Sequence, residues 1–132
     1  HYPLRRQRQM CIRDRYDAHL SILENSGILQ RQSRNHTDKW NYHAMVIILS
    51  TNNLADKVRI NLLSEGIHSY IGYVPLHSSP MGKLMGYSPL DLPVTESVAF
   101  RVLRLPLHHN MVIDDVRLVC ESISKTLKEE II

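Results

Sequence analysis

Along the chain, continuous apolar runs that are typical of β-strands alternate with segments whose apolar residues recur every three or four positions, as in helices. Residues 42–49 form a continuous apolar run rich in β-branched side chains, which predicts a central strand buried on both faces. Leu54, Val58 and Leu62 then step by four, with Ala55 and Leu63 beside them, and this stripe predicts a helix. This alternation favours a domain that contains both helices and a sheet.

Glycine marks the ends of two predicted helices. Residues 16–25 allow one short helix that Ser26-Gly27 stops, since glycine readily adopts the left-handed cap conformation. Gly66 ends the second helix in the same way, and residues 67–74 then return as a second strand with aromatic and β-branched content. Residues 30–40 are polar and are interpreted as a loop.

The second half of the chain begins with a stretch rich in proline and glycine. Residues 75–93 are interpreted as an irregular loop with room for one short helical turn. Pro93 and Thr95 can open a helix whose apolar line would be Val94, Val98 and Val102.

A short strand and a long helix close the pattern. Residues 104–107 are predicted to be extended, because Pro106 disfavours helical backbone at the residue before it. Asp114 can cap a final helix, whose apolar residues fall at spacings of three and four: Val116, Val119, Cys120, Ile123, Leu127 and Ile131. The fold class is therefore α+β, with a sheet of about three strands covered by helices.

Charge divides the chain unevenly. The net charge is +3, but residues 1–15 hold five arginines and one aspartate, so residues 16–132 are slightly acidic. A basic N-terminal arm can bind nucleic acid or anionic membrane, whereas an unstructured, solvated end is the simpler interpretation. Residues 8–15 read RQMCIRDR and look like translated sequencing-adapter read-through. We therefore predict that residues 1–15 are non-native or disordered and that residues 16–132 form the domain.

The cysteines and apolar runs limit the class of protein. Cys11 and Cys120 are far apart, which predicts neither a disulfide framework nor a zinc site. No apolar run approaches the roughly 20 residues that a membrane helix needs. A reducing, cytoplasmic setting is the expectation.

Eight histidines raise the question of a metal site. His108 and His109 are adjacent and would point to opposite faces of a strand, although on a loop they could act together. His43 and His77 could meet only through the fold, and no recognised histidine spacing is present, so we predict no metal. Ser78 and Ser79 follow His77, but we interpret them as a polar turn because no nucleophile-elbow motif surrounds them.

Tyr73 and His77 are the most promising site residues. The segment places an aromatic hydroxyl, a rigid proline bend at Pro75 and an imidazole at one strand end. Ligands are often bound where strands lead into loops. The alternative is a structural turn with a packed tyrosine.

An ordered set of motifs extends this local pattern over about 110 residues. Residues 41–46 read NYHAMV, residues 66–82 read GIHSYIGYVPLHSSPMG, residues 95–97 read TES and residues 103–107 read LRLPL. Together they resemble the C-terminal domain of the DegT/DnrJ/EryC1/StrS sugar aminotransferases. The resemblance implies the small C-terminal domain of a fold-type I enzyme that uses pyridoxal phosphate.

The resemblance also implies an activity for the longer enzyme. It would transfer an amino group from glutamate to a dTDP-4-keto-6-deoxyhexose for cell-surface glycan synthesis, acting as a homodimer without nucleic acid or membrane partners. Tyr73 and His77 would lie on the substrate side. The part of the cofactor site around the Schiff-base lysine has no counterpart here, since Lys39, Lys57, Lys83, Lys125 and Lys128 lack its sequence context. We therefore assign no catalytic residue and expect this chain alone to be inactive.

One departure from the family and one rival function remain open. Gly72 stands where the family usually has histidine, so one candidate substrate contact is missing. The rival is a free-standing α+β interaction module that binds nucleic acid or anionic membrane through residues 1–15.

Overall fold

The computed structural model describes residues 2–32, 44–71 and 74–131. The helices are α1 (Tyr2–Glu24), α2 (Asn52–Ser64), α3 (Pro80–Leu84), α4 (Pro93–Ala99) and α5 (Ile113–Ile131), with 3-10 turns η1 (Leu76–Ser78) and η2 (Pro89–Asp91). The strands are β1 (Leu29–Arg31), β2 (Met45–Leu49), β3 (Tyr70–Ile71) and β4 (Val102–Leu105). The described chain is thus α+β, as predicted.

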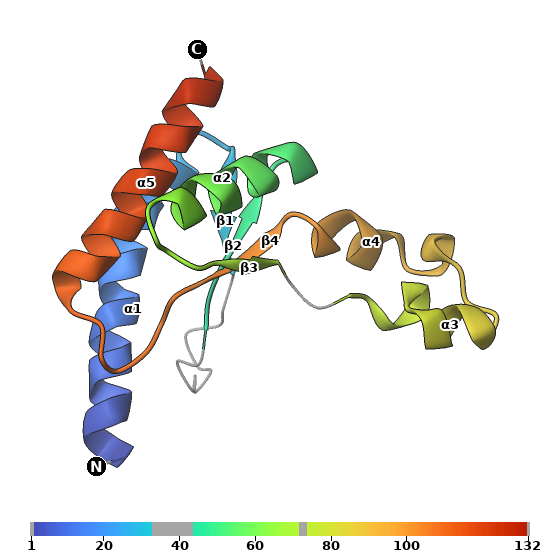
Figure 1. Ribbon diagram of the computed structural model, residues 1–132, viewed down its shortest axis with the longest axis horizontal. Helices are drawn as coiled ribbons and strands as arrows, with labels where there is room; N and C mark the ends of the chain where they lie inside the picture. The colour runs from blue at the N-terminus through green and yellow to red at the C-terminus, as the bar shows by residue number, and fades with distance from the viewer. Residues whose placement is uncertain (1, 33–43, 72–73, 132) are drawn as a thin grey trace.

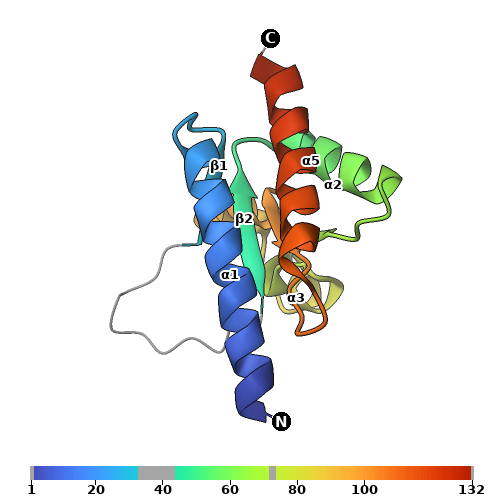
Figure 2. The ribbon, with the colours of Figure 1, turned by 90° about the vertical axis from the view of Figure 1, so that its left-hand side faces the viewer.

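The four strands form one antiparallel sheet in the order β1-β2-β4-β3. Helices α1, α2 and α5 cover one face, and the segment from η1 to α4 projects from the opposite side (Figure 1). A view from the helical side shows α1 and α5 in front of the strands (Figure 2). Among the described residues, the sheet therefore has one face covered by helices and one open face.

The alternation of side chains along β2 explains why only one face is covered. Met45, Ile47 and Leu49 point under the helices and are fully buried, whereas Val46 and Ile48 are half-buried on the open face. We predicted a central strand buried on both faces. The central position is confirmed, but the second face is only partly covered by the described residues.

Most of the predicted apolar stripes build the core. Leu54, Ala55, Val58 and Leu62 of α2 are buried, whereas Leu63 is 49% exposed. In α5, all predicted stripe residues from Val116 to Leu127 are buried. Gly27 and Gly66 adopt positive φ angles of 76° and 80° just beyond α1 and α2, which confirms both predicted stop signals.

The sequence pattern missed one strand and misplaced another. The sheet has four strands rather than about three, because Leu29–Arg31 pairs with β2 inside a segment interpreted partly as a loop. Of the predicted strand 67–74, Tyr70–Ile71 is a strand and residues 67–69 and 74 lie outside the sheet, whereas residues 72 and 73 lie outside the described residues.

The start of α1 also differs from the prediction. We expected a helix only from Tyr16, with residues 1–15 non-native or disordered, but the helix runs from Tyr2. Ile12, Tyr16 and Leu20 step by four and are buried against the core, and residues 4–24 contain neither proline nor glycine. The segment therefore does not form a free basic arm in this structure; its natural origin stays a prediction.

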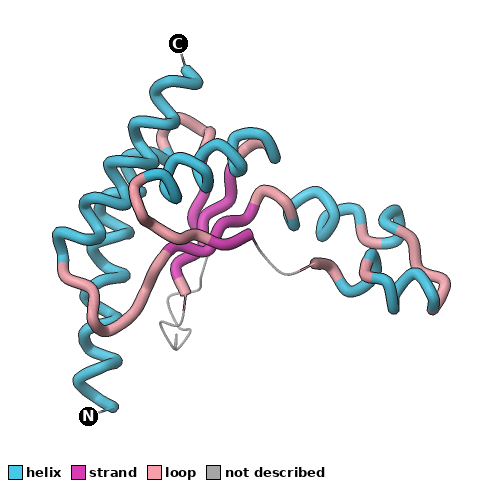
Figure 3. The backbone as a smooth tube through the Cα atoms, viewed as in Figure 1, coloured by secondary structure: helices cyan, strands magenta, loops and turns pink. Residues whose placement is uncertain are grey.

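Helix α4 forms where it was predicted, but it has no core beneath it. Val94 is 75% exposed and Val102 belongs to β4, so the predicted apolar line is not a packed face. Short elements also replace the predicted loop 75–93, which contains η1, α3 and η2. Figure 3 shows these helical turns separated from the main helices by the sheet.

Candidate functional site

His77 lies in η1 and is one of the most buried residues of the projecting segment, with 5% of its surface exposed. Its Nε2 atom lies 3.0 Å from Oε1 of Glu96, which comes from α4. The fold therefore brings the predicted site residue His77 together with the glutamate of the TES motif. Tyr73 lies outside the described residues, so its proximity to His77 stays a prediction.

Polar atoms of both side chains are buried without hydrogen bonds that would offset their loss of contact with water. Within the described residues, neither imidazole nitrogen of His77 nor Oε1 of Glu96 has an aligned hydrogen-bond partner. The contact is therefore a close approach of two groups that becomes an ion pair only when the imidazole is protonated. Chemically, a buried imidazole beside a carboxylate can hold a proton or contact a polar ligand group.

Tight local packing fixes the position of His77. The Ser79 Oγ atom accepts a hydrogen bond from the Gly82 amide at 3.1 Å and so caps α3, which Pro80 opens. A Cβ atom on Gly82 would lie 2.2 Å from the Leu76 carbonyl oxygen, so only glycine fits against η1. Ser78 and Ser79 thus form the polar turn that the sequence predicts, and Ser79 serves as a cap.

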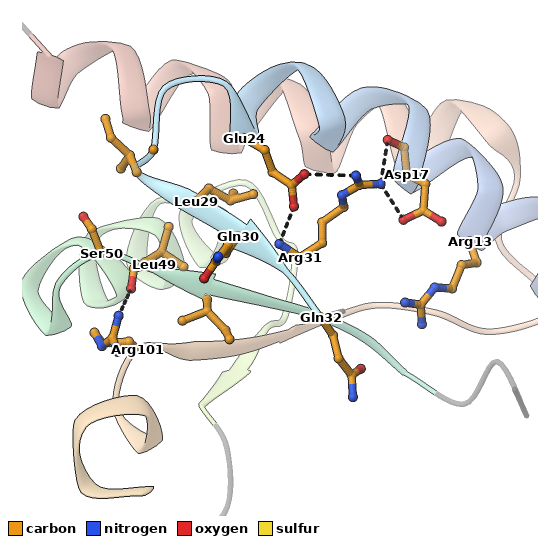
Figure 4. A pocket seen from close by; sticks show the side chains of 13 residues that line it. Arg13, Asp17, Glu24, Leu29, Gln30, Arg31, Gln32, Leu49, Ser50 and Arg101 are labelled. Atoms are coloured by element: carbon orange, nitrogen blue, oxygen red, sulfur yellow. Dashed lines mark hydrogen bonds and ion pairs between the residues drawn. The ribbon is translucent and has the colours of Figure 1, made fainter. Parts of the chain in front are cut away.

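A second feature is a groove of about 900 Å³ between α1 and the β1–β2 end of the sheet (Figure 4). Arg31 of β1 lies at its centre and donates to Asp17 Oδ1 at 3.1 Å and to Glu24 Oε2 at 2.9 Å. The Arg31 backbone N–H also donates to Glu24 Oε1, at 2.6 Å. Two carboxylates of α1 thereby clamp the edge strand.

The arginines that line this groove have protein partners. The hydrogen bond from Arg31 holds the pKa of Glu24 below its ordinary value. Arg101 donates to the carbonyl oxygens of Leu49 at 3.1 Å and Ser97 at 2.8 Å. Arg13 is 2% exposed and donates to the Ala44 carbonyl oxygen. The guanidinium groups of the groove thus form hydrogen bonds within the protein, and the groove is a structural junction between α1 and the sheet.

Sequence reasoning overlooked this junction because it treated residues 30–40 as a loop. The available signal was that Asp17 and Glu24 lie seven apart, on one face of a helix, opposite an arginine in the next segment. Recognising a strand at Leu29–Arg31 would have been necessary to use that signal.

The histidines do not gather around one point in the described chain. His108 is exposed and His109 half-buried in the segment after β4, and His43 lies outside the described residues. Across residues 2–32, 44–71 and 74–131, no group of three or more histidine, cysteine, aspartate or glutamate side chains could hold a metal ion. None of the described helices is long and apolar enough to cross a membrane.

The fold recurs in solved aminotransferases. TlmJ from Streptoalloteichus hindustanus shares 24% identity and a TM-score of 0.84 with this chain, covering 97% of this chain and 33% of its own. Spr1654 from Streptococcus pneumoniae, assigned as a sugar aminotransferase and solved in PMP and PLP forms, shares 22% identity (PMP form) with a TM-score of 0.83, over 97% of this chain and 32% of its own. The chain spans about a third of the length of these relatives.

A third relative has slightly higher identity. The DegT DnrJ EryC1 StrS aminotransferase from Brucella abortus shares 26% identity with a TM-score of 0.74, over 92% of this chain and 31% of its own. Among curated proteins, no sequence matches this chain. The model of the DegT/DnrJ/EryC1/StrS aminotransferase family matches residues 3–124, which is most of the chain. This chain therefore belongs to the DegT/DnrJ/EryC1/StrS aminotransferase family.

Proposed function

We propose that this chain is the C-terminal domain of a pyridoxal phosphate-dependent sugar-nucleotide aminotransferase. The observation that carries the proposal is the family match over residues 3–124, supported by the shared fold with aminotransferases about three times as long. The longer enzyme would be a cytoplasmic homodimer. Within its fold, this chain would correspond to the small domain of a fold-type I enzyme.

The substrate proposal rests on the motifs around His77. The sequence HSSPMG, together with TES and LRLPL, most resembles dTDP-4-amino-4,6-dideoxygalactose transaminase. The proposed reaction transfers the amino group of L-glutamate to a dTDP-4-keto-6-deoxyhexose and leaves 2-oxoglutarate. Its product would serve cell-surface glycans such as enterobacterial common antigen or lipopolysaccharide.

The described residues alone do not form a cofactor site. A lysine that binds the cofactor covalently is activated in a desolvated pocket, but Lys57, Lys83, Lys125 and Lys128 are all exposed, and Lys57 pairs with Glu130. When bound, pyridoxal phosphate supplies the electron sink for the transfer. We therefore propose that another part of the enzyme holds the cofactor and that this chain alone is inactive.

The role left for this chain is on the substrate side. The imidazole of His77 is fixed by η1 and α3 and faces Glu96, whose carboxylate would orient the ring. Both imidazole nitrogens are buried within the described residues, so the proposed contact with a polar group of the substrate requires a shift of the η1 turn in the longer enzyme. Tyr73 completes the proposed substrate contact.

Expression of the continuous reading frame that contains this chain tests the proposal. We expect the longer protein to form 2-oxoglutarate from L-glutamate when dTDP-4-keto-6-deoxyglucose is added, and the 132-residue chain to form none. In the longer protein, His77→Gln should raise KM for the sugar nucleotide more than about tenfold, whereas Ser78→Ala should not. A longer frame without turnover would overturn the enzyme proposal, and turnover by the short chain would overturn its inactivity.

A further inference from the structure

A cavity of about 560 Å³ lies where the loop after α2 and the segment after β4 meet the first turns of α5 (Figure 1). It shares no lining residue with the groove around Arg31, and neither His77 nor Glu96 lines it. Sites for small molecules are usually concave and enclose about 300–1,000 Å³. The cavity therefore has the size of a ligand site and is separate from the features described above.

Part of the lining is apolar and belongs to the core. Met111 and Val119 are each 3% exposed and contribute to both the core and the cavity. Ile67 and Pro106 are half-buried beside them, and Leu118 of α5 is 49% exposed. An apolar group that enters the cavity would leave water for a surface that the packed core already holds in place.

The fixed charge of the lining is negative. Glu65 and Asp115 contribute two carboxylates, and no lysine or arginine lies among the described residues that line the cavity. Asp115 Oδ2 accepts a hydrogen bond from the Val112 amide at 2.9 Å, but within the described chain no hydrogen bond occupies its Oδ1 atom or the Glu65 carboxylate. Arg104 lies 5.7 Å from the centre of the Tyr70 ring without lining the cavity. The carboxylates thus have acceptor atoms left for a cationic ligand.

The remaining polar groups favour an organic cation over a metal ion. His68, His108 and Tyr70 complete the polar lining and are all exposed. Nevertheless, in the part of the chain that the structure describes, no group of three or more histidine, cysteine, aspartate or glutamate side chains could hold a metal ion. A protonated amine does not need such a cluster, because one carboxylate can accept a charge-assisted hydrogen bond from it while neutral imidazole or phenol oxygen accepts another.

We propose that this cavity binds a small amphipathic amine. The apolar body of the ligand packs against Met111 and Val119, and its ammonium group is held by the carboxylates of Asp115 and Glu65. The inference goes beyond the proposed function and does not use the aminotransferase assignment. Its test measures binding and needs no turnover, so its failure is distinct from failure of the proposed function.

Titration of the 132-residue chain with three matched probes, followed by NMR, tests the inference. The probes 2-phenylethylamine, 2-phenylethanol and phenylacetate share an aromatic body and differ in the charge of the polar end. At pH 8 the amine is protonated and an imidazole of ordinary pKa is neutral. We expect the Kd of the amine to be at least about tenfold lower than that of the alcohol, and phenylacetate to bind more weakly than either. The amide signals that shift should include those of Ile67, Met111 and Leu118.

Two variants test the role of charge. Asp115→Asn and Glu65→Gln should each raise the Kd of the amine at least about fivefold and leave that of the alcohol unchanged, because each removes a charge but keeps the size of the side chain. Asparagine also keeps an oxygen for the Val112 amide. Glu121→Gln is the matched control, since Glu121 lies on α5 outside the cavity and pairs with Arg117.

A further pair of variants tests the apolar lining. Leu118→Ala should weaken the binding of the amine and of the alcohol by the same factor, because it shortens a side chain that lines the cavity. Ile113→Ala is its control and should change neither Kd, since Ile113 is 51% exposed on the same helix but does not line the cavity.

Several outcomes would overturn the proposal. These are the absence of amine binding at about 10 mM, equal Kd values for the amine and the alcohol, and an amine Kd that neither charge variant changes. The product of the longer reading frame should show the same preference for the amine. Loss of binding in that product would show that another part of the protein covers the cavity, and would also overturn the proposal.

Discussion

Tyr16 donates a hydrogen bond from its Oη atom to the carbonyl oxygen of Pro106 across 2.6 Å, although the two residues lie 90 positions apart. The tyrosine is fully buried in α1, and Pro106 belongs to the LRLPL motif that follows β4. One side chain thus joins the N-terminal helix to the segment that leads into α5. Burial raises the pKa of Tyr16, so its hydroxyl keeps the proton that it donates.

We predict that Tyr16→Phe lowers the free energy of unfolding by about 1–3 kcal/mol, because it leaves the Pro106 carbonyl oxygen without this donor while preserving the packed ring. Urea unfolding followed by circular dichroism measures the change. Tyr87→Phe is the matched control, since Tyr87 is 53% exposed and should shift the free energy by less than about 0.5 kcal/mol. Tyr87 belongs to residues 74–100, called the apolar lobe because most of their large apolar side chains are exposed. Equal effects of the two variants would contradict the prediction.

Stability should fall in alkaline solution through Cys120. The thiol is 4% exposed in α5, and burial raises its pKa to about 12. The unfolded thiol ionises near pH 8.5, so the stabilising contribution is complete below that pH and is lost as the pH rises toward 12. The slope approaches about 1.4 kcal/mol per pH unit.

Urea unfolding between pH 8 and pH 11 tests this dependence, and Cys120→Ala should remove the loss that begins near pH 8.5. Tyr16 changes the stability in the same direction, because its pKa is also raised in the folded state. The stability should therefore fall further above about pH 10, and Tyr16→Phe should remove that additional loss. An unchanged pH profile in Cys120→Ala would show that the thiol is not responsible.

The clamp between Arg31 and Glu24 should stabilise the chain only above acidic pH. The Arg31 guanidinium holds the pKa of Glu24 below the ordinary value. The stabilising contribution of the pair is therefore present above about pH 4.3 and is lost as the pH falls through the pKa of Glu24 in the folded chain. Glu24→Gln should cost about 1 kcal/mol at pH 7, a figure reduced for the partial exposure of the pair, and little at pH 3.

A second ion pair supplies the comparison for this clamp. Arg117 and Glu121 lie 2.9 Å apart on the surface of α5, where solvent weakens their attraction. Glu121→Gln should therefore leave the urea midpoint at pH 7 nearly unchanged. A loss as large as that of Glu24→Gln would mean that exposed pairs contribute as much as the clamp of β1.

The elements that could be predicted are those whose apolar side chains recur at a regular spacing and pack against the core. The steps of Leu54, Val58 and Leu62 located α2, because a buried helix face must repeat about every 3.6 residues. β1 was not predicted because its three residues, Leu29–Arg31, include one glutamine and one arginine. The strand is stabilised by pairing with β2 and by the hydrogen bond to Glu24. Short edge strands depend on tertiary contacts that local patterns do not record.

The candidate site was predictable only in part. His77 followed from its place after a predicted strand, but its partner Glu96 comes from a helix nineteen positions later, and no spacing rule links the two. The predicted line of Val94, Val98 and Val102 failed for a related reason. Helical periodicity predicts a buried face, but the apolar lobe has no core against which α4 can bury it.

Gly82 should control the order of the apolar lobe without affecting the main core. A Cβ atom at this position would lie 2.2 Å from the Leu76 carbonyl oxygen and 2.7 Å from that of His77, and both are backbone atoms that cannot rotate away. Gly82→Ala should therefore separate α3 from η1 and disturb the contact of His77 with Glu96. Because the core lies across the sheet from the lobe, the melting of α1, α2 and α5 should change little.

Hydrogen exchange measured by mass spectrometry separates these two effects. We expect peptides from residues 74–100 of Gly82→Ala to exchange at least about tenfold faster than in the wild-type chain, with unchanged exchange in peptides from α5. Lys83→Ala is the matched control, since Lys83 is the exposed neighbour on the same helix. Faster exchange across the whole chain would show that the lobe and the core unfold together, and unchanged exchange in the lobe would show that the backbone accommodates the added methyl group.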